Sequence, residues 1–182
     1  MEQGINCERR GLDLGRDATG YGSLLAAQQG DRAAFQDLVQ DYETLVLRVA
    51  LNVTGSQYAA QQIYSRVFTE AFLSVNKLRP GSSVFLWVHR LLARHCLEYC
   101  RQHPHTVDLD GCEKDSQRRL LAAIRSLPPH ERVILQLKHY QGLKVRTLAE
   151  IFDATPEFVI QSLQSANTHL QRQLRAEVST LP

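Results

Sequence analysis

Apolar side chains recur at every third or fourth position along most of this chain, the spacing that gives a helix one buried face. The first such run extends from about residue 31 to residue 55, and its apolar positions are Phe35, Leu38, Val39, Tyr42, Leu45, Val46, Val49 and Val53. Asp31 suits the N-cap of this segment and Gly55 suits its end. The pattern therefore predicts a long amphipathic helix.

Two further helices are predicted before residue 103. One extends from about Gln57 to Val75, and the other from about Val84 to Gln102, after Pro80 and its neighbouring glycine. The positions expected to face inward are Ile63, Val67, Ala71, Phe72 and Val75 in the former, and Phe85, Val88, Leu92, Cys96 and Tyr99 in the latter. Helices connected this closely form a bundle.

Residues 103–117 interrupt the helical pattern, because they hold proline, glycine and four acidic side chains. A second helical unit follows, in which Pro128 and Pro129 separate two helices and Gly142 ends the later one. Its apolar positions are Leu120, Leu121, Ile124, Leu127, Val133, Ile134, Leu137 and Tyr140. No segment alternates apolar and polar residues as a strand does, so we predict an all-α fold.

The stretch from Val145 to Leu174 predicts two helices joined by a tight turn at Asp153 and Ala154. Thr155 can cap the second helix, and Pro156 occupies its favoured first position. The apolar positions are Val145, Leu148, Ala149, Phe152, Val159, Leu163, Ala166 and Leu170. We favour a DNA-binding helix-turn-helix over an ordinary helical hairpin, because helix length, turn length and cap all agree.

The 182 residues, of which 43% are hydrophobic and 22% charged, suit a globular protein of two small domains. The formal net charge of +2 is uneven, since residues 103–117 hold one basic and four acidic side chains. We divide the chain into a flexible arm (1–20), a first domain (21–102), an acidic linker (103–117) and a second domain (118–176). The mildly basic domains suit a polyanionic partner, although an ordinary solvated surface carries such charge equally well.

The chain has no motif of a familiar catalytic site: no glycine-rich phosphate loop, HExxH, GxSxG or pair of facing carboxylates. We therefore expect neither enzymatic activity nor a cofactor. No apolar stretch reaches the ~20 residues of a membrane span. The charged start lacks a secretory signal, so we expect a cytoplasmic location.

Four cysteines are too few for a disulfide scaffold, and they are Cys7, Cys96, Cys100 and Cys112. Cys96 and Cys100 stand one helical turn apart, with His95 and His103 nearby. Such a cluster can hold zinc, but burial of Cys96 as a small core residue explains the pattern as well. We predict no metal site.

Four short sequence motifs occur in a specific order: GDRAAF at residues 30–35, VFLWVHRLLARH at 84–95, LPPHERV at 127–133 and HYQGL at 139–143. Over about residues 22–174, they resemble the extracytoplasmic-function branch of bacterial RNA polymerase sigma factors, in the sigma-70 superfamily. The matching elements are its GDxxAF opening, its aromatic promoter-melting helix, its LPxxxRxV opening and its YxGL step.

The resemblance implies that the first domain binds the polymerase core and opens the −10 promoter element. A flipped base would lie against the loop from Asn76 to Ser83, and Trp87 would stack on an exposed base. Core packing explains a lone tryptophan equally well, and the arginines can meet phosphates or form a solvated face. The −10 candidates are Arg79, Ser82, Trp87, Arg90, Arg94, His95, Glu98 and Arg101, and the core-polymerase candidates are Gln61, Gln62, Ser65 and Phe68.

The resemblance also implies that the second domain places its last helix in the major groove of the −35 element. The candidate residues are Thr155, Glu157, Phe158, Gln161, Ser162, Gln164 and Ser165. The implied partners are RNA polymerase core, promoter DNA and an anti-sigma protein.

The polar contact surfaces depart from the family pattern. Where the family resembles TVKSRLSRAR, this chain has Ile160, Ser162, Ser165 and Asn167 in place of basic residues. Fewer phosphate contacts predict weaker −35 binding with a flatter salt dependence. The acidic core-binding run of the family, resembling DAEDLTQE, is AAQQIYSR at residues 59–66 and has lost every carboxylate.

We predict a sigma factor that directs polymerase to a small set of promoters, and two alternatives stay open. One is a sigma-like adapter that binds protein partners without recognising a promoter, which exposure of Phe158 and Ile160 would favour. The other is a metal or thiol sensor built on the same scaffold.

Overall fold

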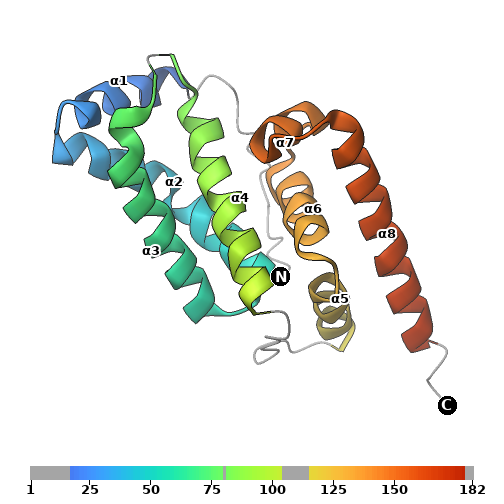
Figure 1. Ribbon diagram of the computed structural model, residues 1–182. Coiled ribbons are helices and arrows are strands. Elements are labelled where there is room, and N and C mark those ends of the chain that lie inside the picture. Colours follow the sequence, from blue (N-terminus) through green and yellow to red (C-terminus); the bar gives the residue numbers. More distant parts are fainter. Residues whose placement is uncertain (1–16, 80, 104–114, 179–182) are drawn as a thin grey trace, which may run out of the picture.

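A computed structural model describes residues 17–79, 81–103 and 115–178, and every regular element within these ranges is a helix (Figure 1). The predicted all-α class is therefore confirmed. Most of the expected arm and linker falls on residues 1–16 and 104–114, which lie outside the described ranges. No helix within those ranges has both the length and the apolar character that crossing a membrane requires.

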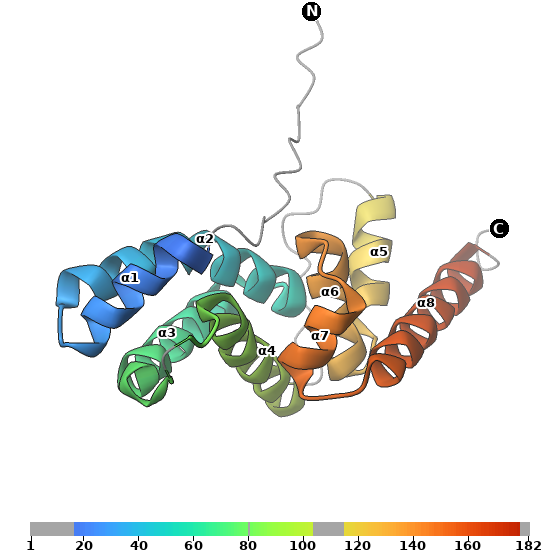
Figure 2. The same cartoon turned by 90° about the horizontal axis from the view of Figure 1, so that it is seen from above.

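The first half of the chain folds into helices that lie against one another (Figure 2). They are α1 (Asp17–Gln28), α2 (Arg32–Thr54), α3 (Gln57–Ser74), the short 3₁₀ helix η2 (Val75–Lys77) and α4 (Val84–Gln102). The bounds of α2, α3 and α4 agree with the sequence-based prediction to within about one residue. This agreement follows from strong local signals at the helix ends.

The second half contains α5 (Asp115–Arg125), α6 (Pro129–Gln141), α7 (Val145–Phe152) and α8 (Pro156–Val178). Helix α8 packs against α5, α6 and α7, and it forms the outer edge of the molecule in both views (Figures 1 and 2). A tight turn joins α7 to α8, as the sequence predicts.

Helices α1 and α5 correct the sequence-based prediction, since α1 begins inside the expected arm and α5 inside the expected linker. Leu24 and Ala27 of α1 are 1% and 7% exposed, and Ala123 of α5 is 2% exposed. Helix α1 gains its cover from α2, and α5 gains it from α8. These tertiary contacts stabilise turns that the sequence pattern left in the arm and the linker.

The helix ends carry the expected caps. The Asp31 carboxylate accepts hydrogen bonds from the backbone N–H groups of Ala33 and Ala34, at 2.9 and 3.2 Å. Gly55 ends α2 with a φ of 70°, a left-handed conformation that costs a residue with a Cβ about 1 kcal/mol or more. An added Cβ at Gly55 would also overlap the guanidinium of Arg125, which lies against the bare backbone here.

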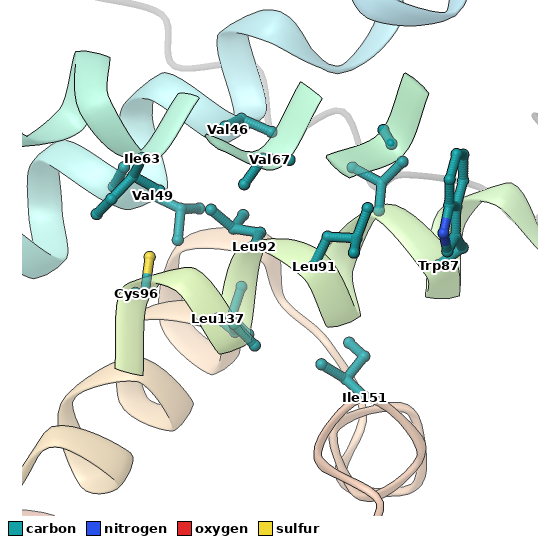
Figure 3. Packing of buried hydrophobic residues seen from close by; sticks show 14 of the residues in the cluster. Val46, Val49, Ile63, Val67, Trp87, Leu91, Leu92, Cys96, Leu137 and Ile151 are labelled. Atoms are coloured by element: carbon teal, nitrogen blue, oxygen red, sulfur yellow. The ribbon is translucent and has the colours of Figure 1, made fainter. Parts of the chain in front are cut away.

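One buried cluster continues from the first half of the chain into the second (Figure 3). Leu137 of α6 and Ile151 of α7 belong to the same cluster as Val46 of α2 and Leu92 of α4. Helix α6 lies against both α2 and α4, and α7 lies against α4. The division into domains near residue 102 stays a prediction from the sequence pattern, and the packing is continuous across it.

Phe72 departs from its expected inward position, because its side chain is 54% exposed. The preceding residue, Ala71, is buried, and one step along a helix turns the side chain by about 100°. The Phe72 ring instead meets the edge of Phe35 at the surface, with 5.3 Å between ring centroids.

His89 is a buried imidazole within α4, with 0% of its surface exposed. Its Nδ1 lies 2.8 Å from the Phe85 carbonyl oxygen, so that nitrogen carries the proton and donates. Burial lowers the pKa of His89 from 6.5 to about 4, and the hydrogen bond to Phe85 opposes this only in part. The folded chain therefore holds His89 neutral.

The unfolding free energy should fall by about 2 kcal/mol between pH 7.5 and pH 5 because of His89. Below pH 6.5 the unfolded chain takes up a proton at His89 that the folded chain refuses down to about pH 4, so acid favours unfolding. Urea unfolding at the two pH values measures the loss, and the His89→Gln variant should lack this part of it. Equal losses in the two proteins would contradict the assignment.

Candidate nucleic-acid interface

Three arginines form a stripe along one face of α4. Arg90, Arg94 and Arg101 are exposed and stand four and seven residues apart, so they lie on one side of the helix. Glu98, another of the predicted −10 residues, is exposed on the same face between Arg94 and Arg101. The positive charges of the stripe can contact successive phosphates of one strand.

A carboxylate from α3 occupies the centre of the stripe. The Oε1 of Glu70 forms an ion pair with the Nη2 of Arg94, and the Oε2 of Glu70 lies 2.8 Å from the Nε2 of His95. The Nδ1 of His95 in turn lies 4.0 Å from the carboxylate of Glu98. Because Glu70 and Arg94 are substantially exposed, their pair contributes at most about 1 kcal/mol. A phosphate can compete for Arg94 at small cost.

The loop before α4 holds two more of the −10 candidates. Arg79 is exposed and Ser82 is half-buried, and the Ser82 N–H donates to the Arg79 carbonyl oxygen at 3.1 Å. The side-chain amide of Gln28 in α1 donates to the carbonyl oxygens of Val75 and Leu78, both at 2.9 Å. Gln28 thus ties the loop to α1, a role that sequence reasoning missed because no local pattern links residues this far apart.

Trp87 lies in the core, with 9% of its surface exposed (Figure 3). Trp87 therefore packs in the core in this structure, and it would have to become exposed before it could stack on a base. Among the core-polymerase candidates, Gln61 and Ser65 are exposed and Gln62 is half-buried. Phe68 is only 7% exposed and packs on Tyr64, with ring centroids 4.8 Å apart, so it supports α3 from inside.

The outward face of α8 presents most of the predicted −35 residues. Exposed side chains are Thr155, Glu157, Phe158, Ile160, Gln161 and Gln164, and Ser165 is half-buried. Thr155 caps the helix, since its hydroxyl oxygen accepts from the Phe158 N–H at 3.3 Å. Ser162 departs from the prediction, because it is 5% exposed and shares the inward face with Val159 and Ala166. It is unavailable to DNA in this arrangement.

Helix α7 covers part of the α4 stripe. The Nε of Arg90 donates to the Glu150 carbonyl oxygen near the end of α7, at 3.0 Å. On the opposite side of the junction, the Nη1 of Arg48 donates to the Tyr140 hydroxyl at 3.0 Å. The two halves are thus joined by polar contacts at their rims as well as by the shared core.

Arg132 of α6 lies at the centre of this junction and is 9% exposed. Its Nη1 donates to the Val53 carbonyl oxygen of α2 at 3.4 Å and lies 3.9 Å from the Cys100 sulfur of α4. Its Nη2 donates to the carbonyl oxygens of Arg125 and of Leu127, the latter at 3.0 Å. One guanidinium therefore fastens α2, α4 and the α5–α6 turn.

Cys96 and Cys100 are buried thiols. Burial raises the pKa of both, and Arg132 opposes this rise at Cys100. Both thiols therefore stay protonated and unreactive. In the part of the chain that the structure describes, no group of three or more metal-binding side chains comes together. Cys7 and Cys112 lie outside that part.

Comparison with known proteins finds a family match over part of this chain and a similar fold among solved structures. Residues 38–105, which span most of α2 through α4, match sigma-70 region 2. The solved structure of CnrH in complex with the cytosolic domain of CnrY superposes with a TM-score of 0.68 over 86% of this chain and 97% of that chain. At 16% sequence identity, the likeness shows a common fold.

Three curated relatives are RNA polymerase sigma factors. SigE of Mycolicibacterium smegmatis, an extracytoplasmic-function sigma factor, is 27% identical over 143 residues, covering 67% of this chain and 55% of SigE. The sigma-H factor of Pseudomonas aeruginosa is 23% identical over 149 residues, covering 68% of this chain and 77% of that protein. SigW of Bacillus subtilis, another extracytoplasmic-function sigma factor, is 20% identical over 173 residues, covering 81% and 92%. The chain thus spans little more than half the length of SigE.

Proposed function

We propose that the chain is a divergent member of the extracytoplasmic-function branch of the sigma-70 superfamily and acts as a transcription initiation factor. It brings RNA polymerase core to specific promoters and opens their −10 element. The observation that supports this most directly is the position of the arginine stripe, which lies on α4 within the region 2 match. The chain itself supplies binding energy and no bond-breaking chemistry.

In this proposal the stripe holds the backbone of a separated strand. Arg94 exchanges its ion pair with Glu70 for a phosphate, while Arg101 is already exposed. Each arginine that neutralises a phosphate releases about one counterion, which gives the complex its salt dependence. The exposed Gln61 and Ser65 of α3 then face the polymerase core with hydrogen-bonding groups in place of carboxylates.

Promoter binding in this proposal requires α7 to leave α4. Arg90 is held by the Glu150 carbonyl oxygen, and α7 packs along α4, so the stripe is partly covered in the arrangement described above. Separation of the halves would free Arg90 and let α4 and α8 reach two promoter elements at once. A protein partner can stabilise the closed arrangement, in which α7 packs on α4. CnrH, which has a similar fold, was solved with the cytosolic domain of CnrY. We propose an anti-sigma protein as such a partner.

Run-off transcription with purified core polymerase tests the proposal, using a promoter library at low salt. The wild-type chain should start transcription at a small set of promoters. Arg94→Ala and Arg101→Ala should each weaken promoter binding and reduce the slope of log affinity against log salt by about 1.

Arg32→Ala is the matched control, since Arg32 is an exposed arginine at the start of α2, outside the stripe. It should leave both affinity and salt slope unchanged. Absence of specific transcripts from a folded wild-type chain, confirmed by circular dichroism, would reject the proposal.

A second function is favoured by one observation on α8. Phe158 and Ile160 are 42% and 43% exposed on a recognition helix that lacks lysine and arginine through residue 171. Such a surface suits an adapter that binds protein partners without recognising a promoter. A pulldown that recovers polymerase subunits, together with no protection of any promoter in the library, would support the adapter.

A further inference from the structure

The outward edge of α8 carries amides where a basic helix would carry guanidiniums. Gln161 and Gln164 are both exposed and stand three residues apart, so their side chains project from the same face. Neither side chain hydrogen-bonds to another residue that the structure describes. The inward face is occupied by Val159 and Ala166, both 0% exposed, which fixes the rotation of the helix.

This edge is also free of other helices. Helix α8 packs on α5, α6 and α7, and it borders the molecule on the side away from α1 to α4 (Figure 2). The edge is therefore accessible while α7 packs on α4, whereas Arg90 of the α4 stripe is held by α7. A major groove can accept an α-helix presented in this way.

An amide and a guanidinium read different bases. A glutamine side chain makes a bidentate contact with the N6 and N7 of adenine, whereas arginine and lysine contact the O6 and N7 of guanine. From residue 147 to residue 171 the chain has no lysine or arginine, so the first four turns of α8 have no such side chain to read guanine. Ile160 is 43% exposed beside the amides and can contact the methyl group of a thymine.

The spacing fits neighbouring base pairs. Three residues advance about 4.5 Å along a helix, and successive base pairs of B-DNA are about 3.4 Å apart. Lys144 and Arg146 lie exposed at the start of α7, where a preceding helix crosses the DNA backbone and can contact phosphates. Recognition and phosphate contact are thus separated between the two helices.

We propose that Gln161 and Gln164 read two successive adenines, so that the upstream element of this chain's promoters is specified by A·T pairs and not by guanine. The inference rests on the proposed function, because polymerase must hold the chain near the promoter. Glu150, Asp153 and Glu157 repel phosphates around this edge, so the duplex contact is weak without polymerase.

The test uses the full chain with core polymerase and promoters whose upstream element is randomised. Sequencing of the transcripts should show adenine enriched at two adjacent positions. Gln161→Arg should change the preferred base at one of them to guanine, and Gln164→Arg should do so at the other, each by about tenfold. Gln171→Arg is the control, since it adds the same charge at an exposed position of the same helix and should strengthen binding without changing either base.

Any other result overturns the inference, and the transcripts show whether the inference fails alone or together with the proposed function. Specific transcripts with no adenine preference, or a preference that neither arginine variant changes, would reject the reading of adenines by Gln161 and Gln164. They would leave the proposed function intact. No specific transcripts from the wild-type chain or any variant would reject the proposed function and the inference together.

Discussion

Arg132→Met should lower the free energy of unfolding by about 4 kcal/mol. Methionine keeps much of the aliphatic length but removes the donors, so the buried carbonyl oxygens of Val53, Arg125 and Leu127 lose their partner. Each unsatisfied buried acceptor costs about 1–3 kcal/mol, and Arg132 is 9% exposed, which leaves little room for water to replace its guanidinium. Urea unfolding followed by circular dichroism measures the loss.

Arg172→Met provides the matched control, because Arg172 is exposed on α8 and the same substitution there should change stability by less than about 0.5 kcal/mol. Arg132→Lys separates charge from geometry, since an ammonium cannot span α2 and the α5–α6 turn as a planar fork does. We expect Arg132→Lys to recover less than half of the loss. A loss below about 1 kcal/mol for Arg132→Met would show that the junction does not depend on this side chain.

Leu137→Ala should destabilise the chain by about 3 kcal/mol, within the range found for fully buried leucines. Leu137 is 0% exposed and belongs to the cluster that includes Leu92 and Cys96 of α4, so the cavity opens at the boundary between the halves (Figure 3). Leu51→Ala is the matched control, because Leu51 is 41% exposed and loses few contacts.

The same variant tests whether the two halves unfold together. Trp87 is the single tryptophan of the chain and lies in α4, so its fluorescence reports the first half, whereas circular dichroism reports all helices. If the shared core couples the halves, Leu137→Ala in α6 should shift both midpoints by the same amount. A fluorescence midpoint that stays at the wild-type value would show that the first half unfolds independently.

Some features of the candidate DNA-binding surfaces follow from the local sequence, and others depend on tertiary packing. The exposed amides of α8 could be predicted from the sequence, because the apolar positions Val159 and Ala166 determine which face of that helix turns inward. The contacts that hold the arginines of the α4 stripe could not be predicted, since Glu70 comes from α3 and the Glu150 carbonyl oxygen comes from α7. Burial of Trp87 likewise depends on which helices pack against α4.

Local sequence signals were enough to predict where most of the helices begin and end. Asp31, Gly55 and Thr155 act through backbone groups only a few residues away, so their effect can be predicted without any tertiary contact. The shared core of the two halves and the role of Arg132 in joining them depend instead on how the helices pack. A buried guanidinium is stable only where several carbonyl oxygens converge, and that convergence joins residues 79 positions apart, a separation over which no sequence periodicity carries information.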